Sequence, residues 1–239
     1  HALHILYRAL RDAMPIFFLV AAGLMLIWAH TLYDFSPDRP RPNSIVYALD
    51  IPSHSAKWLS YDPEPDDWTR QFLGANPAVV HTGIFDQFES GLRLLEQQTS
   101  PVDLVAPDVH LVDRRRVRGK TYVKVRIKSN RDTSFMRIRF DGPGDMIAFY
   151  AGDRLIYQKN QSAQVASIDL HALPEQGTIL TFVLPADISL QQLEIIETRP
   201  DLAEIWQSKY QPRPENSMPM RSSSTLPVDA VILRQLYFL

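Results

Sequence analysis

The chain begins with a long hydrophobic segment that carries no charge. Residues 13–29 read AMPIFFLVAAGLMLIWA, and the apolar character continues through Tyr33. At 1.5 Å per residue, about 21 helical residues cross a hydrocarbon core of about 30 Å. Pro15 stands near the start of the segment, where its missing N–H costs little, and Trp28 stands where interfacial aromatic residues are typical. We therefore expect one transmembrane helix within residues 1–34.

Two other interpretations of this segment stay open. A buried core helix is usually shorter or carries a polar stripe, and no polar repeat of 3.6 residues is present. A cleaved signal peptide needs small residues at its cleavage site, and Trp28-Ala29-His30 is a poor match. The spanning helix fits the pattern best.

Charges at the two ends of the segment predict its orientation. Arginines at positions 8 and 11 precede it, and Asp34, Asp38 and Arg39 follow it. Positive residues favour the cytoplasmic side of a membrane. We therefore expect the short N-terminal flank in the cytoplasm. Residues after about Tyr33 are expected on the extracytoplasmic side, periplasmic or lumenal.

Three prolines interrupt the residues after the hydrophobic segment. Residues 34–42 read DFSPDRPRP, a sequence that does not form a helix. We expect residues 35–42 to form a stiff, extended spacer. Residues 43–239 then form the extracytoplasmic domain.

Apolar and polar residues alternate along much of the second half of the chain. In residues 120–128, KTYVKVRIK, the apolar Val123, Val125 and Ile127 alternate with basic residues. A period of two predicts a strand with one buried and one solvated face. Such segments recur every 8–12 residues or so, which is typical of a sandwich or a barrel. The expected strands are residues 44–49, 57–61, 109–112, 121–128, 135–141, 146–150, 154–158, 165–170, 178–184, 192–198 and 228–238.

The predicted fold class is therefore mainly β, an antiparallel, jelly-roll-like β-sandwich preceded by one transmembrane α-helix. A short helix is also expected over residues 66–73, because acidic residues suit its first turn and Gly74 is placed to end it. Apolar side chains recur at helical spacing in residues 84–95, but Gly91 makes a loop almost equally consistent with that segment.

Composition excludes several classes of function. The 239 residues include no Cys, which excludes disulfide scaffolds, cysteine-ligated zinc, iron–sulfur clusters and thiol catalysis. The formal net charge of −2 excludes a globally basic nucleic-acid binder, and no nucleic-acid partner is expected. Eighteen prolines against nine glycines favour rigid connections over glycine-rich phosphate loops.

One segment departs from this charge balance. Residues 113–128 carry eight Lys or Arg residues and one Asp, a sum of +7. Such a surface binds anionic headgroups at about 1 kcal/mol per nearby cation, or docks on an acidic domain. The alternative is a solvated strand face that discourages edge aggregation. The candidate interaction face comprises Lys124, Arg126, Lys128, Arg137 and Arg139.

No motif for catalysis or metal binding occurs in the sequence. There is no HExxH pair, GxSxG elbow, Walker loop or dinucleotide fingerprint. His110 and Asp113 form the nearest metal-like pair, but a regularly alternating strand would point them to opposite faces. Asp66 and Asp67 diverge by about 100° on a helix and suit capping better than acid–base catalysis. We therefore expect no catalytic residue, metal ligand or cofactor in this chain.

Residues 42–74, PNSIVYALDIPSHSAKWLSYDPEPDDWTRQFLG, carry a more specific pattern. It consists of an Asn-Ser pair, an apolar strand that ends in Asp, a Trp-x-Ser segment, and Asp-x-Trp-Thr leading to Phe-Leu. The residues concerned are Asn43, Ser44, Tyr47, Asp50, Lys57, Trp58, Ser60, Asp66, Trp68, Thr69, Phe72 and Leu73. This pattern resembles the segment after the last membrane helix in a family of membrane-bound zinc aminopeptidases, the relatives of the endoplasmic-reticulum metallopeptidase and the vacuolar membrane protease.

The resemblance implies an N-terminal peptidase domain with two zinc ions, several membrane helices and a β-rich C-terminal domain on the peptidase side. In that family the metal ligands and the catalytic Glu belong to the N-terminal domain, and no position here matches them. The chain would be the last membrane helix and the noncatalytic C-terminal module of a zinc-dependent exopeptidase. Its expected partners are the lipid bilayer and the missing peptidase domain, which would hold the zinc. Trp58 and Trp68 are expected to pack a hairpin on a helix.

Two other functions stay open. One is a membrane-anchored β-sandwich that binds envelope glycan, lipid or protein through exposed aromatic residues or the basic face. The other is a structural subunit of an envelope assembly.

Overall fold

The computed structural model describes residues 2–33, 35–81, 85, 92–131, 133, 135–140, 146–159, 167–171, 173–202, 205, 209–221 and 227–239. The chain divides into two compact units. The first unit comprises His1–Pro42 and Arg213–Met218, and the second comprises Asn43–Pro212 and Pro219–Leu239. The boundary at Asn43 coincides with the predicted start of the β domain.

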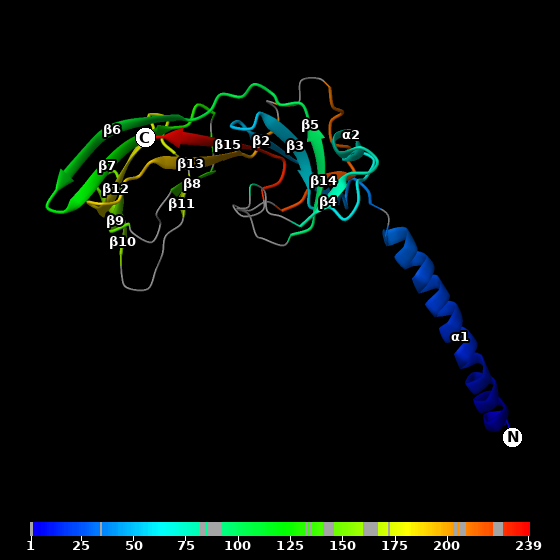
Figure 1. Ribbon diagram of the computed structural model, residues 1–239. Helices are drawn as coiled ribbons and strands as arrows, with labels where there is room; N and C mark the ends of the chain where they lie inside the picture. The colour runs from blue at the N-terminus through cyan, green and yellow to red at the C-terminus, as the bar shows by residue number, and fades with distance from the viewer. Residues whose placement is uncertain are drawn as a thin grey trace. The chain divides into compact units, whose positions relative to one another are not determined.

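The first unit consists mainly of one long helix, α1 (Ala2–Tyr33), which is drawn in blue in Figure 1. Its window Ala13–His30 is long and apolar enough to span a membrane, and none of this window is buried. Large apolar side chains such as Leu19 and Trp28 are 76% and 67% exposed. This exposure contradicts the interpretation as a buried core helix and favours membrane anchoring.

The helix begins earlier than the apolar pattern predicts. It starts at Ala2, so Pro15 lies inside the helix and not near its start. A proline at an internal position removes one hydrogen bond between a backbone N–H and the carbonyl four residues earlier. Membrane helices tolerate such a proline, so the difference in length leaves the membrane assignment unchanged.

The predicted spacer contains a turn and is not fully extended. Arg39 N–H donates to the Ser36 carbonyl at 2.9 Å, and Ser36 N–H donates to the Arg39 carbonyl at 3.2 Å. Pro37 occupies the second position of this turn, where its fixed φ is favourable. After the turn, β1 (Arg41–Asn43) pairs with β14 (Ser217–Pro219) in a two-stranded sheet.

The second unit contains an eight-stranded sheet and a five-stranded sheet (Figure 1). All neighbouring strands run antiparallel except β15 and β2, which run parallel. The order in the larger sheet is β11 (Ser167–His171), β8 (Phe135–Phe140), β13 (Gln192–Arg199), β15 (Ala230–Phe238), β2 (Val46–Asp50), β3 (Ser55–Ser60), β5 (Leu94–Thr99) and β4 (Ala78–Val80). The order in the smaller sheet is β10 (Arg154–Gln158), β9 (Ala148–Ala151), β12 (Thr178–Pro185), β7 (Lys120–Lys128) and β6 (Asp108–Val117).

The two sheets pack face to face over one hydrophobic core. Val125 and Ile127 of β7 and Phe182 of β12 come from the smaller sheet, and Ile138 of β8 and Ile195 of β13 come from the larger one. All five side chains are fully buried. This arrangement is a β-sandwich, and the predicted fold class, mainly β after one apolar helix, is confirmed.

A short helix covers the other half of the same face of the larger sheet. Leu233 of β15 belongs to the apolar cluster around Trp58, and Tyr237 of the same strand packs against the core between the two sheets. Because the two residues are an even number of positions apart on one strand, both clusters lie on the same face of the sheet. In the second cluster, α2 (Arg70–Leu73) packs Phe72 against Trp58 of β3. The predicted helix over residues 66–73 is therefore present in its last turn.

The strand β5 was not expected from the sequence. It begins Leu94-Leu95, and these neighbours are buried in different clusters on opposite faces of the sheet. Two adjacent apolar residues hide the alternation that identifies a strand. The helix considered for residues 84–95 is thus wrong at its C-terminal end, while residues 82–84 and 86–91 lie outside the described residues.

Candidate functional site

The five residues of the predicted basic face are divided between the two sheets. On β7, Lys124, Arg126 and Lys128 alternate with buried apolar residues and point away from the sandwich core. On β8, Arg137 and Arg139 also alternate with buried residues, but β8 belongs to the larger sheet. Because two stacked sheets turn their outer faces in opposite directions, the five residues do not share one face. Each strand alternates as predicted, and only the shared face is corrected.

Carboxylates on neighbouring strands neutralise Arg137 and Arg139. Arg137 forms a bidentate pair with Asp169 of β11, with Nε–Oδ1 and Nη2–Oδ2 distances of 2.7 and 2.8 Å. This hydrogen bonding raises the pKa of the Arg137 guanidinium. Arg139 Nη1 lies 3.1 Å from Glu194 Oε2 on β13. Both arginines are thus occupied within the sheet.

The same row of ion pairs continues across the larger sheet. Arg234 of β15 contacts Glu194, and its Nη1 lies 2.8 Å from Asp50 Oδ1 on β2. Asp50, one of the residues of the aminopeptidase-like pattern, therefore holds a cation of a neighbouring strand. Partly exposed pairs of this kind contribute about 1 kcal/mol or less each. Their main consequence is an electrically balanced face.

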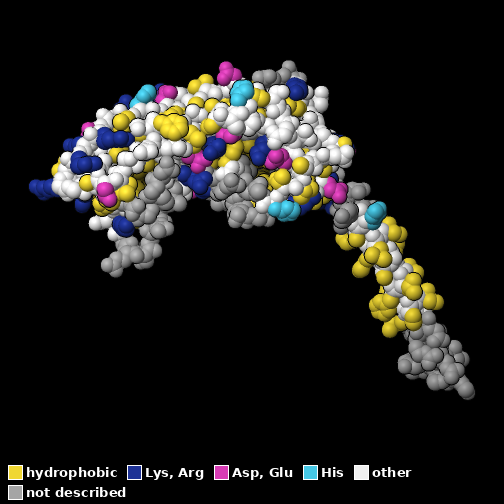
Figure 2. Space-filling view, in the orientation of Figure 1, with side chains coloured by type: hydrophobic (Ala, Val, Ile, Leu, Met, Phe, Trp, Pro, Cys, Tyr) yellow, Lys and Arg dark blue, Asp and Glu magenta, His cyan; other side chains and the backbone are white. Residues whose placement is uncertain are grey.

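The excess positive charge is concentrated on the antiparallel hairpin of β6 and β7. We call Asp108–Lys128 the basic hairpin; it carries eight Lys or Arg residues against two Asp residues. Arg118 and Gly119 have φ values of 49° and 73°, as a tight two-residue hairpin turn requires. Basic side chains gather over this end of the second unit (Figure 2). The eight cations are Arg114, Arg115, Arg116, Arg118, Lys120, Lys124, Arg126 and Lys128.

The cations of β7 are less compensated than those of the larger sheet. On β6, Arg115 Nε lies 3.6 Å from Asp113 Oδ2. Within the described part of the chain, no carboxylate comes within ion-pair distance of Lys124, Arg126 or Lys128. The two outer faces of the sandwich therefore differ in electrostatics, one balanced and the other positive.

His110 and Asp113 lie on the same face of β6, contrary to the sequence prediction. The pairing with β7 places His110 opposite Arg126 and Asp113 opposite Lys124, and the register shifts between Leu111 and Asp113. This β-bulge adds one residue and cancels the expected change of face. The pair still faces two cations, an unfavourable setting for a metal ion.

The aromatic residues of the aminopeptidase-like pattern form one packed unit. Trp58 is 1% exposed, and its ring centroid lies 4.8 Å from that of Phe72 and 5.0 Å from that of Tyr47. Trp68 packs on Phe72 at 5.1 Å and donates from Nε1 to the Gln211 carbonyl at 2.9 Å. These contacts join β2 and β3 to α2, as the sequence predicted for the two tryptophans.

The polar residues of the same pattern form hydrogen bonds that fix the turn directly before α2. Asn43 Nδ2 donates to Asp66 Oδ2 at 2.8 Å. Asp66 Oδ1 also accepts the backbone N–H groups of Trp68 and Thr69, at 3.1 and 2.7 Å. Asp66 therefore holds the turn that precedes α2, whose N-cap residue is Thr69 and not Asp66.

A buried carboxylate that the pattern does not include completes this region. Asp62, 5% exposed, accepts the backbone N–H and the hydroxyl of Ser44 at 3.2 and 3.0 Å. Burial raises the pKa of Asp62, although its hydrogen bonds with Ser44 and Ser60 oppose the rise. Ser44 is thus a structural hydrogen-bonding residue at the start of the β domain.

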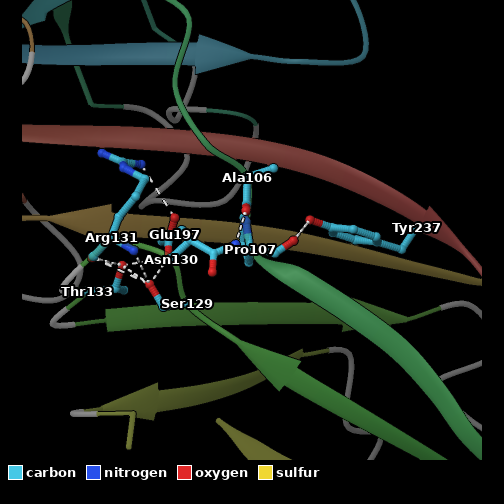
Figure 3. A network of polar contacts seen from close by, with 8 residues as sticks. All are labelled: Ala106, Pro107, Ser129, Asn130, Arg131, Thr133, Glu197 and Tyr237. Carbon is cyan, nitrogen blue, oxygen red and sulfur yellow. Dashed lines mark hydrogen bonds and ion pairs between the residues drawn. The ribbon is translucent and has the colours of Figure 1, made fainter. Parts of the chain in front are cut away.

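A second buried network lies on the inner face of the larger sheet, between the part covered by the smaller sheet and the part covered by α2 (Figure 3). Glu197 is fully buried on β13, and its Oε1 accepts hydrogen bonds from the hydroxyls of Ser129 and Thr133. Arg131 Nη1 lies 3.4 Å from Glu197 Oε2. The sequence contained a signal for this network, since Glu197 continues the inward positions of Leu193 and Ile195.

The same network fixes the connection that leads from β5 to β6. Asn130 Nδ2 donates to the Ala106 carbonyl at 2.9 Å, and the Tyr237 hydroxyl donates to the Pro107 carbonyl (Figure 3). Burial raises the pKa of Tyr237, and the nearby Glu197 carboxylate adds to the rise. The arrangement ties the two sheets together and leaves Glu197 enclosed by its partners.

A groove of about 490 Å³ opens beside this network. Lys128 and Asn130 line one side, and Leu173 and Glu175 come from the connection between β11 and β12. Gly177, with φ of 80°, packs this connection so closely on β7 that a Cβ would lie 2.4 Å from the Ile127 carbonyl oxygen. The groove is therefore fixed by backbone contact.

In the part of the chain that the structure describes, no three His, Asp or Glu side chains are grouped so that they could hold a metal ion. The zinc that the resemblance implies would belong to another domain. Comparisons with protein-family models, with curated proteins and with solved structures find no match for this chain.

Proposed function

We propose that this chain is the noncatalytic, membrane-anchored C-terminal module of a zinc-dependent exopeptidase. The helix α1 would anchor the module in the bilayer, with residues after about Tyr33 on the extracytoplasmic side. The β domain would hold or cover the peptidase domain near the membrane. Peptide hydrolysis would take place in that N-terminal domain, which would carry the zinc.

One observation carries the proposal: the residues of the aminopeptidase-like pattern come together as a structural unit. Trp58 and Trp68 both pack against Phe72, while the hydrogen bond from Asn43 to Asp66 fixes the chain before α2. These side chains are occupied by packing and hydrogen bonds. Such a pattern is expected of a signature for a fold, and it supports a module whose role is support and not chemistry.

The family assignment is tested by the gene that encodes this chain. The coding sequence ahead of His1 should specify several hydrophobic segments and, before them, a domain with a His-x-Asp motif and a Glu-Glu pair. A start codon directly before His1 would contradict the assignment to an exopeptidase. It would leave the membrane-anchored binding module as the better description.

The noncatalytic role is tested by peptidase assays on the purified full chain. With zinc added, hydrolysis of aminoacyl-coumarin substrates should stay at the level of a chelator-treated sample. Turnover that zinc restores after chelation would contradict the proposal. A Trp58→Ala variant, which should be less stable, serves as a control, because hydrolysis that does not fall with the fraction of folded chain identifies a contaminating peptidase.

A second candidate function is a binding module, and the charge of the basic hairpin favours it. Lys124, Arg126 and Lys128 lie on an outer sheet face without carboxylate partners among the residues described. This function is compatible with the first, since an accessory module can bind a surface and support a peptidase at once.

A further inference from the structure

The positive charge of the basic hairpin is not explained by protection of a sheet edge. Basic residues on an edge strand discourage pairing with another chain, and β6 is such an edge. The strand β7, however, lies between β6 and β12, so its backbone groups are already paired. Lys124, Arg126 and Lys128 therefore need another explanation.

On the outer face of the larger sheet, arginine side chains are paired with carboxylates of neighbouring strands. On the larger sheet, Arg137 pairs with Asp169, while Arg139 and Arg234 share Glu194. The outer face of β7 lacks this compensation within the described residues. On the basic hairpin, Asp108 and Asp113 lie opposite Lys128 and Lys124 without forming ion pairs with them, and the cations outnumber these two carboxylates. Such a positive strand face is the electrostatic complement of an anionic surface.

Apolar side chains accompany these cations on the basic hairpin. Val117 stands directly before the Arg118–Gly119 turn and is 44% exposed. Val112, the extra residue of the bulge, is 52% exposed. Cations beside exposed apolar groups are typical of surfaces that lie at a membrane interface, where headgroups meet the cations and the acyl boundary meets the apolar groups.

We propose that the basic hairpin binds the anionic headgroups of a lipid bilayer, with Val117 at its tip reaching the interface. The hairpin would supply a second membrane contact in addition to α1. Lipid is favoured over an acidic protein because the cations of β7 share the hairpin with two exposed valines of β6, Val112 and Val117. The proposal rests on the membrane-anchored part of the proposed function and not on the link to a peptidase.

The absence of Cys from the chain permits a direct test. Val117→Cys gives a single site for an environment-sensitive fluorophore in the full chain, held in nanodiscs of phosphatidylcholine. Vesicles of phosphatidylcholine, with or without phosphatidylglycerol, are then added, and the emission is followed. A second set of discs that contain phosphatidylglycerol tests the bilayer in which the chain itself is anchored. A label at Val79, which is 48% exposed on β4, is the control site.

We expect the Val117 label to shift to shorter wavelength with phosphatidylglycerol in at least one of these two settings, and not with phosphatidylcholine alone. The Val79 label should not shift. Replacing Lys124, Arg126 and Lys128 by Gln should lower vesicle affinity about 5-fold per charge, or about 100-fold in all. Added salt should weaken binding by the unsubstituted chain, a measurement that does not depend on how the variant folds.

The matched control removes three cations elsewhere in the second unit, with the same change in net charge. Arg70 and Arg139 are paired with Asp67 and Glu194, and Lys209 lies over the Tyr210 ring. Replacing Arg70, Arg139 and Lys209 by Gln should leave the affinity within about 3-fold of the unsubstituted chain. An equal loss in both triple variants would mean that net charge alone governs binding, and would overturn the assignment to the hairpin.

Two other results would overturn the proposal. One is a Val117 label that fails to respond to phosphatidylglycerol in either setting. The other is a response to polyglutamate with none to vesicles, which would identify an acidic protein as the partner. Neither result bears on the coding sequence ahead of His1, so failure here is distinct from failure of the exopeptidase proposal.

Discussion

Replacing Glu197 by Gln should strongly destabilise the second unit. The Glu197 side chain is 0% exposed and that of Arg131 is 4% exposed, so the substitution removes the negative charge that Glu197 supplies to a buried guanidinium. Breaking a buried pair from one side costs about 3–5 kcal/mol. The total stability of a domain is about 5–15 kcal/mol, so this loss is a large fraction. The hydroxyls of Ser129 and Thr133 also lose their charged acceptor.

The double variant Arg131→Met with Glu197→Gln should be more stable than Glu197→Gln alone. It removes both charges of the buried pair, so the substitution at Glu197 no longer takes a counter-charge from a guanidinium. Equilibrium unfolding in urea, followed by tryptophan fluorescence of the full chain in nanodiscs, measures each variant. Glu175→Gln, an exposed carboxylate beside the same groove, is the control and should change stability by less than about 0.5 kcal/mol.

Two outcomes would refute this reasoning. The first is a Glu197→Gln variant within about 1 kcal/mol of the unsubstituted chain, which would mean that the buried charge is not held as the structure shows. The second is a double variant whose loss equals the sum of the two single losses. Additive losses indicate that the two side chains act independently.

Three further predictions concern the fold. Trp58→Ala should cost about 3–5 kcal/mol in urea unfolding, because the buried indole contacts three rings; a loss below about 1 kcal/mol would contradict its role in the core. Gly177→Ala should destabilise more than Gly119→Ala: both glycines have positive φ, but only at Gly177 does a Cβ meet backbone. Equal losses in the free energy of unfolding would show that the backbone shifts to relieve the close contact between a Cβ at position 177 and Ile127. Burial raises the pKa of Asp62, so ionisation of this carboxyl is less favourable in the folded state than in the unfolded state. The contribution of Asp62 to the free energy of unfolding therefore falls as pH rises from the unfolded pKa through the folded pKa. Urea unfolding across acidic to neutral pH should therefore show the unsubstituted chain losing stability relative to Asp62→Asn as pH rises; a relative gain would contradict this sign.

The strands could be predicted where each strand has one buried face. Between Val123 and Lys128 of β7 the apolar and basic residues alternate, and the observed burial follows that alternation. The same reasoning fails for β5, because Leu94 and Leu95 are buried on opposite faces of a sheet that is covered on both sides. It also fails at His110 and Asp113, where one bulged residue reverses the face.

The sequence predicted on which side of its own strand each residue of the candidate site lies. It did not predict which strands are neighbours or which sheet each strand joins. Local alternation correctly pointed Arg137 and Arg139 away from the core, yet it cannot show which sheet a strand joins. Their carboxylate partners, Asp169 and Glu194, lie 32 and 55 residues further along the chain. Pairing over such distances is set by the packing of whole strands, which a local pattern does not record.

The amino-acid sequence alone determined the apolar helix, the class of the β domain and the concentration of positive charge, because each depends on the order of nearby residues. Only the tertiary structure decided which charges remain uncompensated. It placed β7 and β8 in different sheets and brought the arginines of β8, but not the cations Lys124, Arg126 and Lys128 of β7, into ion pairs with carboxylates among the residues described. It also buried Glu197 together with Arg131. Electrostatic compensation depends on distance in space, and it therefore emerges only when the strands are assembled.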